Sequence, residues 1–245
     1  MIASDQSVLC WGHAGAQLVA PDGPFQEVTG GKVHSCGLDP AGALACWGED
    51  SKGQLQAPPG TYIDVASGRF HSCALTEQGG AICWGSDAFN QTEVTPGSYL
   101  ALSGGLYHTC AVGTDASLTC WGYGNSGRLD APDEGSFVDV SAGASNACAL
   151  TEDGAVVCWG ENGSGQSTPP EDTGFVEVAV GNYHSCALDS AGQVHCWGEA
   201  DHPMMTPPEG SFTAIALGYG HACAIASDGG VQCWGNSDSQ KLEVP

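Results

Sequence analysis

The sequence predicts an all-β fold built from one repeated unit, and two observations predict it. First, tryptophan recurs every 36 to 38 residues along a chain of 245 residues, always within a Cys-Trp-Gly tripeptide. The seven positions are Trp11, Trp47, Trp84, Trp121, Trp159, Trp197 and Trp234. A fixed period of this length is typical of repeat architectures. Second, each unit contains short runs of Val, aromatic and small residues between turn signals, with no segment of helical length or period, which favours strands.

The order of the runs is the same in every unit. An aromatic residue opens the first run, as in Phe175–Gly181, and a His-x-Cys-Ala-Leu segment follows, as in His184–Leu188. After a polar turn, an apolar run leads into Cys-Trp-Gly, and a Gly/Asn/Asp-rich stretch with a proline pair such as Pro207-Pro208 closes the unit. Four short strands per unit indicate the blade of a β-propeller.

The second and third runs predict a hairpin whose register can be worked out. Folding Cys148 onto Cys158 pairs Leu150 with Val156 and leaves the three-residue loop 152–154. Such a loop needs a left-handed residue near its end, which favours glycine. The position holds Gly42, Gly79, Gly154, Gly192 and Gly229 in five units, and Ala116 in the sixth.

This register places two cysteines of a unit directly opposite each other, at a spacing that a disulfide tolerates. We therefore expect six disulfides, and Cys10 is left without a partner in its own unit. The expected pairs are Cys36–Cys46, Cys73–Cys83, Cys110–Cys120, Cys148–Cys158, Cys186–Cys196 and Cys223–Cys233. Buried free thiols are one alternative; a zinc array is another, but zinc favours clustered Cys-x2-4-Cys pairs. Disulfides require an oxidising compartment, so we expect an extracellular, cell-surface or periplasmic protein.

The repeated pattern also resembles a known family. The pattern Val-Ala-x-Gly-x-x-His-x-Cys-Ala-Leu-x-x-x-Gly-x-Val-x-Cys-Trp-Gly-x-x-x-x-Gly-Gln is nearly complete over Val178–Gly198 and Val140–Gln166. It resembles the repeat of the RCC1 (regulator of chromosome condensation) family over essentially the whole chain. The resemblance implies a seven-bladed β-propeller forming a single domain over residues 1–245. The repeats are also similar to those of the secreted bacterial β-lactamase inhibitor protein II family, and their cysteines to those of surface bacterial proteins and plant CRINKLY4 receptor kinase ectodomains.

The repeated segments are too few for seven complete blades. There are seven Cys-Trp-Gly segments but six aromatic-led segments, which begin at Phe25, Tyr62, Tyr99, Phe137, Phe175 and Phe212. Aligning Cys10 with Cys233 places Ile2–Asp5 on the identical residues Ile225–Asp228. We therefore expect six complete four-stranded blades and a partial first blade. Either upstream sequence is absent or the ring has a gap at the first blade, and the absence of a signal peptide from Met1–Asp5 favours a longer gene product.

The charge of the chain excludes several classes of partner. It has 28 Asp and Glu against 5 Lys and Arg, a net charge of -23. Nucleic acid binding and attraction to an anionic membrane both need many cations, so neither is expected. No apolar run approaches the length of about 20 residues that a spanning helix needs. An acidic surface favours a basic partner, or serves solubility.

Histidine recurs at one position of the unit, at His34, His71, His108, His184 and His221, with Asn146 in the remaining unit. A ring of metal ligands or bases is one interpretation. The favoured interpretation is a structural hydrogen bond in each blade, because equivalent positions on different blades are too far apart to share an ion. The same structural role is expected of the seven tryptophans.

Acidic residues also share one position, at Glu27, Asp64, Asp139 and Glu177. They could hold a cation in the channel, but we favour solvated charges at strand ends. The loops Glu49–Gly53 and Glu161–Gly165 lack the carboxylate pattern of a calcium loop. We predict no metal and no cofactor.

Departures from the repeat predict the functional surface. Aromatic residues vary just before the recurring histidine, at Phe70, Tyr107, Tyr183 and Tyr219, and after Trp-Gly, at Phe89 and Tyr123. Other variable positions after Trp-Gly are His13, Asp50, Asn162, His202 and Asp238. Equivalent loops of a propeller share a face, so these aromatic residues form a candidate partner-binding rim. The alternative is that each ring fills a gap between blades. In the inhibitor family that the chain resembles, the corresponding loops carry aromatic contacts to the target.

No nucleophile elbow, phosphate-binding loop, Cys-x-x-Cys or His-Glu-x-x-His motif occurs, and Ser, His and Asp form no constellation apart from the repeat. We therefore expect a non-catalytic, disulfide-stapled extracellular module that binds a macromolecular partner, a protein in the first place, through one rim. One alternative is a guanine-nucleotide exchange factor, which the RCC1 resemblance implies but the disulfides and the few basic residues disfavour. Another is a calcium- or glycan-binding surface adhesion module.

Overall fold

The computed structural model describes residues 1–11, 18–200, 203–236, 242 and 244. Six antiparallel sheets of three strands follow one another along this part of the chain. The sheets are β1 (Glu27–Gly30), β2 (His34–Leu38) and β3 (Leu44–Gly48); β4 (Tyr62–Ser67), β5 (His71–Thr76) and β6 (Ala81–Gly85); β7 (Tyr99–Gly104), β8 (His108–Gly113) and β9 (Leu118–Gly122); β10 (Phe137–Ala142), β11 (Asn146–Thr151) and β12 (Val156–Gly160); β13 (Phe175–Val180), β14 (His184–Asp189) and β15 (Val194–Gly198); and β16 (Phe212–Leu217), β17 (His221–Ala226) and β18 (Val231–Gly235). Two 3-10 turns are η2 (Asn125–Gly127) and η3 (Pro203–Met205).

The hairpins have the predicted register. Cys148 lies opposite Cys158 and Leu150 opposite Val156. The five predicted turn glycines have φ between +80° and +88°, a left-handed conformation that costs other residues energy. Ala116 adopts the same conformation, with φ of +64°, in the turn that lacks glycine.

All six predicted disulfides are present. Their Cα–Cα distances are 4.0–4.1 Å, slightly shorter than the expected spacing of about 4.5 Å. Each bridge joins the second and third strands of one sheet, and Cys10 is the free cysteine. Burial raises the pKa of the Cys10 thiol.

Two details of the predicted architecture are wrong. The described residues form six sheets, as many as the expected complete blades, but not a seven-bladed ring, and each sheet has three strands rather than four. The predicted fourth run forms turns, because prolines such as Pro169 and Pro170 cannot donate to a sheet ladder. Near the N-terminus, a single bridge joins Ile2 and Val8, which matches the Ile225–Val231 pair of β17 and β18.

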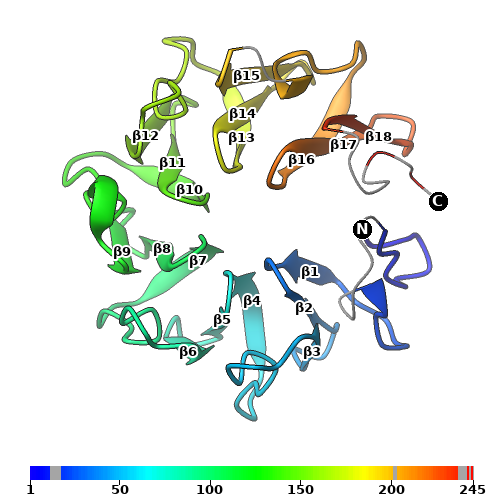
Figure 1. The fold of residues 1–245 in the computed structure, drawn as a ribbon, viewed down its shortest axis with the longest axis vertical. Helices are drawn as coiled ribbons and strands as arrows, with labels where there is room; N and C mark the ends of the chain where they lie inside the picture. Colours follow the sequence, from blue (N-terminus) through cyan, green and yellow to red (C-terminus); the bar gives the residue numbers. More distant parts are fainter. Residues whose placement is uncertain (12–17, 201–202, 237–241, 243, 245) are drawn as a thin grey trace.

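The sheets are arranged around a common centre (Figure 1), with the first strand of each sheet innermost and the third outermost. The N-terminal segment and the β16–β18 sheet lie on the same side of this ring. The apolar cores lie between neighbouring sheets: Leu188 of β14, for example, shares a buried cluster with Phe212 and Ile215 of β16. Stability therefore depends on contacts between neighbours, as in other repeat proteins. No helical segment of the described residues is long and apolar enough to cross a membrane.

Candidate functional site

Both sets of variable loops lie on the same edge of the molecule, which we call the upper rim. It comprises the loops between the first and second strands of each sheet and the loops that begin after Trp-Gly. Backbone hydrogen bonds join them: Ser86 N donates to Phe70 O and Tyr123 N to Tyr107 O, each at 2.8 Å, and Glu199 N donates to Tyr183 O at 3.1 Å. The turns between second and third strands lie at the other end of the strands, on what we call the lower face.

Three aromatic rings from neighbouring sheets form a cluster on the upper rim. The ring centroid of Phe89 lies 5.2 Å from that of Tyr107 and 4.6 Å from that of Tyr123, and the two tyrosine rings are 6.2 Å apart. The Phe89 side chain remains 40% exposed. A second pair, Tyr183 and Tyr219, has centroids 6.4 Å apart, with 45% and 64% of the two residues exposed.

Both arginines of the chain contact the aromatic cluster. The Arg69 guanidinium lies 4.9 Å from the centroid of Phe70 and 5.4 Å from that of Tyr107, and it donates a hydrogen bond to the Tyr107 hydroxyl. The Arg128 guanidinium lies 5.0 Å from the Tyr123 centroid. Guanidinium groups at these distances are attracted by the faces of the rings.

Arg128 is held firmly in its place. Its Nε donates to Asn125 O at 2.8 Å, and its two terminal nitrogens donate to Ala144 O and Ser145 Oγ, both at 3.2 Å. Burial lowers the pKa of the Arg128 guanidinium. This side chain therefore fixes the rim between the β7–β9 and β10–β12 sheets.

The sequence contained a signal for Arg128 that we did not use. The residue stands where three other units have a buried glutamine, at Gln54, Gln91 and Gln166. Gln54 Oε1 accepts from Lys52 N at 2.8 Å, which closes the loop, and its backbone oxygen accepts from Trp84 Nε1 at 2.9 Å. The Arg128 backbone oxygen keeps the second role, accepting from Trp159 Nε1 at 3.0 Å, while its side chain turns to the rim.

All six aromatic residues of the predicted rim thus lie on one edge, in two groups. The first group is Phe70, Phe89, Tyr107 and Tyr123, and the second is Tyr183 and Tyr219. Exposure of Phe89, Tyr183 and Tyr219 argues against the alternative that each ring fills a gap between blades. The variable residues His13, His202 and Asp238 lie outside the described residues.

The recurring histidines connect neighbouring sheets. His34 Nε2 lies 2.8 Å from Ser72 Oγ of the next sheet, and His71 Nε2 lies 2.9 Å from Thr109 Oγ1. Burial lowers the pKa of His34 and His71 to about 4, so both rings are neutral at pH 7. This geometry matches the structural hydrogen bond that we favoured from the sequence, rather than a ring of ligands or bases.

The inter-sheet contact of His108 lacks this hydroxyl. The position of Ser72 and Thr109 is occupied by Ala147 in the β10–β12 sheet, so no hydroxyl faces His108. Neither ring nitrogen of His108 has a hydrogen-bond partner among the described residues. Burial lowers the pKa of this ring to about 3.

Three of the inner-strand acids also join sheets, so the interpretation of solvated charges is wrong for Glu27, Asp64 and Glu177. Asp139 instead accepts from Val140 N of its own strand. Asp64 Oδ2 accepts from Leu102 N of the next sheet at 2.8 Å, and both Glu177 oxygens lie 3.3 Å from Ile215 N. Burial, with a smaller effect from Asp64, raises the pKa of Glu27 to about 8. Burial likewise raises the pKa of Glu177 to about 7. Within the described ranges, no group of three His, Cys, Asp or Glu residues could hold a metal ion.

The two loops considered for calcium hold their polar groups internally. Asp50 Oδ1 accepts from Leu55 N at 2.9 Å, and Asp50 Oδ2 accepts from Gln56 Nε2 at 3.2 Å. Glu161 Oε1 accepts from Gly163 N at 3.2 Å. These carboxylates serve the loop geometry.

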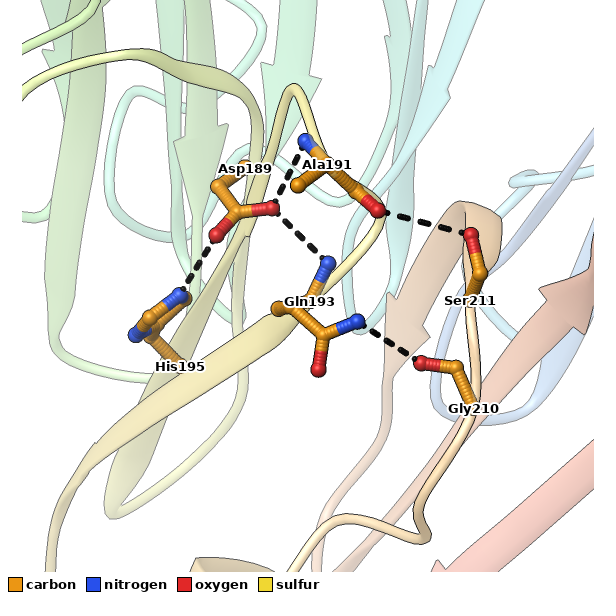
Figure 2. Close-up of polar contacts among 6 residues, drawn as sticks. All are labelled: Asp189, Ala191, Gln193, His195, Gly210 and Ser211. Carbon is orange, nitrogen blue, oxygen red and sulfur yellow. Dashed lines mark hydrogen bonds and ion pairs between the residues drawn. The ribbon is translucent and has the colours of Figure 1, made fainter.

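On the lower face, an Asp–His pair was not found from the sequence (Figure 2). His195 Nε2 lies 2.9 Å from Asp189 Oδ2, and Asp189 Oδ1 accepts from the backbone N–H groups of Ala191 and Gln193 at 2.9 and 2.8 Å. Burial alone would raise the pKa of Asp189, but these hydrogen bonds and the imidazole together lower it. Ser211 Oγ donates to Ala191 O at 3.4 Å and points away from His195, so the group holds the turn and has no activated nucleophile.

Comparison with known proteins identifies the repeat. The regulator of chromosome condensation (RCC1) repeat matches residues 62–91, 137–166, 175–202 and 212–240. The chain carries RCC1 repeats. A search of curated proteins found no match to the chain.

Solved structures with RCC1-like folds resemble the chain along most of its length. The CRINKLY WD40 ectodomain of the Arabidopsis thaliana receptor kinase ACR4 is 26% identical, with a TM-score of 0.82, covering 99% of this chain and 91% of that one. The entire ectodomain of the Physcomitrella patens receptor kinase CR4 is 24% identical, with a TM-score of 0.79 over 90% of this chain, which spans 64% of that ectodomain. Prp20p from Saccharomyces cerevisiae, described with its binding to Gsp1p and histones, is 18% identical, with a TM-score of 0.78, covering 88% of this chain and 73% of that one.

The upper rim is where the RCC1 repeats of this chain differ from one another. The recurring His, Cys and Trp positions of each sheet hold the same residues in nearly every unit. The aromatic residues and arginines of the rim fall at positions that vary between units. The fold therefore supplies the frame, and the variable rim positions distinguish this chain.

Proposed function

We propose that the protein is a non-catalytic extracellular interaction module that binds a protein partner through the aromatic groups of the upper rim. The observation that carries the proposal is the pair of aromatic groups, partly exposed and placed on one edge at positions that differ between repeats. Tyrosine and arginine are the residues most enriched where protein interfaces derive their binding energy.

Two further observations support the extracellular location. Six disulfides need an oxidising compartment to form and persist. The receptor kinase ectodomains are similar over nearly the whole described fold. A cell surface, a periplasm or a secreted state each satisfies these requirements.

A protein is the class of partner that we propose. Prp20p, which shares the fold, is described with Gsp1p and histones as binding partners. At 18% identity the likeness supports the fold alone, so exchange-factor activity is not carried over. An adhesion role through calcium lacks a suitable carboxylate group in the described part of the chain.

Phage display of random peptides tests the proposal with the oxidised, full-length chain. Peptides selected on the wild type are measured against a rim variant, Phe89→Ser with Tyr183→Ser, which removes one ring from each aromatic group. The matched control, Val138→Ser with Val176→Ser, removes two exposed apolar side chains from the inner strands. We expect at least about tenfold weaker binding to the rim variant alone, because truncated interface anchors cost about 2 kcal/mol or more. Equal binding to both variants, or no selected peptide at all, would contradict the proposal.

A further inference from the structure

The net charge of the chain conceals a difference between its two faces. Every described Lys and Arg lies in an upper-rim loop, Lys32 and Arg69 before the recurring histidine and Lys52 and Arg128 after Trp-Gly. The lower-face turns contain acids and no Lys or Arg, with one representative in each turn at Asp39, Glu77, Asp115, Asp153, Asp189 and Asp228. Both faces carry acids, but the described cations that offset them lie on the rim alone.

Arg69 has no carboxylate partner among the described residues. The one ion pair within 4.0 Å in the described part of the chain joins His195 and Asp189, on the lower face. The Arg69 guanidinium has one described hydrogen-bond partner, the Tyr107 hydroxyl, and its buried Nε has none. Because a guanidinium carries five N–H donors, most of the donors of Arg69 have no described partner.

Comparison with Arg128 shows that the unpartnered donors are specific to Arg69. All three nitrogens of Arg128 donate to described backbone or hydroxyl oxygens. Arg69 is instead positioned by aromatic groups, between the Phe70 and Tyr107 rings. A half-buried charge with unmet donors gains most from a ligand that supplies acceptors, since the cost of desolvation has already been met in the fold.

We propose that Arg69 anchors a carboxylate of an acidic peptide segment in the partner, whose adjoining apolar side chain packs on Phe89 and Tyr107. This inference rests on the proposed function of the rim and names the chemistry of the partner. The planar fork of the guanidinium matches the two oxygens of an Asp or Glu side chain. It also reverses the expectation of a basic partner, which followed from the net charge alone.

The surroundings favour a peptide over a sulfated glycan. A polyanionic chain needs a row of cations, whereas Arg69 is flanked by rings. Acidic side chains stand in the neighbouring rim loops, including Asp50, Asp87 and Glu161. They would repel an extended polyanion while leaving room for one carboxylate beside an apolar group.

The experiment uses the peptides that the display selects on the oxidised full-length chain. We expect Asp or Glu beside an aromatic or aliphatic residue in those peptides. Arg69→Gln should weaken their binding about ten- to a hundredfold, the loss that follows from removing hydrogen bonds to a charged group. Lys52→Gln removes the same charge from the same rim at a side chain without a described cation–π contact, and we expect a change of less than about fivefold.

Two further variants keep the test decisive. Arg69→Lys retains the charge but loses the fork, so it should bind nearly as weakly as Arg69→Gln, and it serves if the latter unfolds. Tyr107→Phe keeps the ring and removes the hydroxyl that positions Arg69, so an intermediate loss is expected. Circular dichroism and a thermal melt establish that each variant is folded before binding is compared.

The outcomes separate this inference from the proposed function. Peptides that need Phe89 and Tyr183 but lack acidic residues, and that bind Arg69→Gln as tightly as the wild type, would overturn the anchor and leave the rim proposal standing. Peptides that bind the rim variant unchanged would overturn both. A heparin-derived oligosaccharide that binds the wild type more tightly than the peptides, and loses binding in Arg69→Gln, would replace the peptide as occupant.

Discussion

The contacts between neighbouring sheets and the rim above them come from the same repeat, but they use it in opposite ways. Between sheets, the same groups meet repeatedly: histidine with a hydroxyl, and tryptophan with a backbone oxygen. On the rim, equivalent positions hold Phe70, Tyr107, Ser145 and Tyr183. The repeated contacts are those on which folding depends, so variation is concentrated where the fold does not need a particular residue.

This difference distinguishes the residues that stabilise the fold from the residues that are available for recognition. A repeated position contacts the next sheet and is buried, whereas a variable position is partly exposed and contacts other variable positions. Arg128 follows the rule in both respects, since its backbone keeps the repeated contact with Trp159 and its side chain joins the rim. The following predictions test this division, beginning with the largest effect.

Removing a disulfide should destabilise the fold and spare the rim. The double variant Cys148→Ala, Cys158→Ala opens a loop of about eleven residues, and we expect a loss of about 3 kcal/mol in the free energy of unfolding. Chemical denaturation measures the loss, with rim binding of the selected peptides measured well below the midpoint. Peptide binding that falls in step with stability would show that the two regions are not separate.

Supplying the missing hydroxyl between two sheets should stabilise the protein. Ala147→Ser places an oxygen where Ser72 faces His34, next to the unpartnered ring of His108, and we expect a gain of about 1 kcal/mol. The converse change, Thr109→Ala, leaves buried His71 Nε2 without its partner and should cost about 1–3 kcal/mol. Denaturation midpoints at pH 7 measure both changes. A loss in Ala147→Ser would mean that the site has no room for the added oxygen.

Stability should be greatest slightly below neutral pH, because two sets of buried groups oppose each other. Glu27 and Glu177 have folded pKa values raised to about 8 and 7, so the free energy of unfolding rises as pH falls through these values. His34, His71 and His108 have folded pKa values lowered to about 4, 4 and 3, so stability is lost as pH falls below about 6.5. Each effect follows from burial of a group that would otherwise be charged.

The variant Glu27→Gln isolates the first effect. At pH 8 it removes a partly buried carboxyl that faces Asp64, and we expect a gain on the order of 1 kcal/mol after allowing for its contact with water. At pH 5 Glu27 is protonated in the folded state, and the gain should disappear. Glu77→Gln, on an exposed turn of the lower face, changes the net charge equally and is the control. A gain of the same size in both variants would assign the effect to net charge.

The sequence was sufficient for everything that depends on local pairing. The ten-residue spacing of Cys148 and Cys158 and the glycine at position 154 together determine a hairpin, so the register and the disulfides followed. The prediction of a fourth strand in each unit was wrong. It assigned a run rich in Gly and Pro to a strand by analogy with other propeller blades, without asking whether its backbone could pair in a sheet. Proline's missing N–H was already visible in the sequence.

Contacts between sheets could not be predicted in the same way. Nothing local to Glu27 or Glu177 shows that a backbone N–H from the next sheet will meet the carboxyl, so both were misread as solvated. The rim aromatics were found because they depart from the repeat, whereas Arg69 and Arg128 were counted only as charges. The role of each arginine depends on which aromatic rings lie beside it, and only the assembled fold determines those neighbours.

The smallest effect on stability is expected on the rim itself. Tyr219 is 64% exposed, and its described ring contact is with Tyr183, another rim residue. Tyr219→Ser should therefore change the free energy of unfolding by less than about 0.5 kcal/mol, as is usual for surface positions. Tyr62, at 2% exposure, is the matched contrast, since Tyr62→Ser removes a ring from the core between sheets and should cost about 3–5 kcal/mol. Thermal melts of the two variants compare a rim tyrosine with a core tyrosine. A loss above about 2 kcal/mol in Tyr219→Ser would show that this rim residue contributes to the stability of the fold.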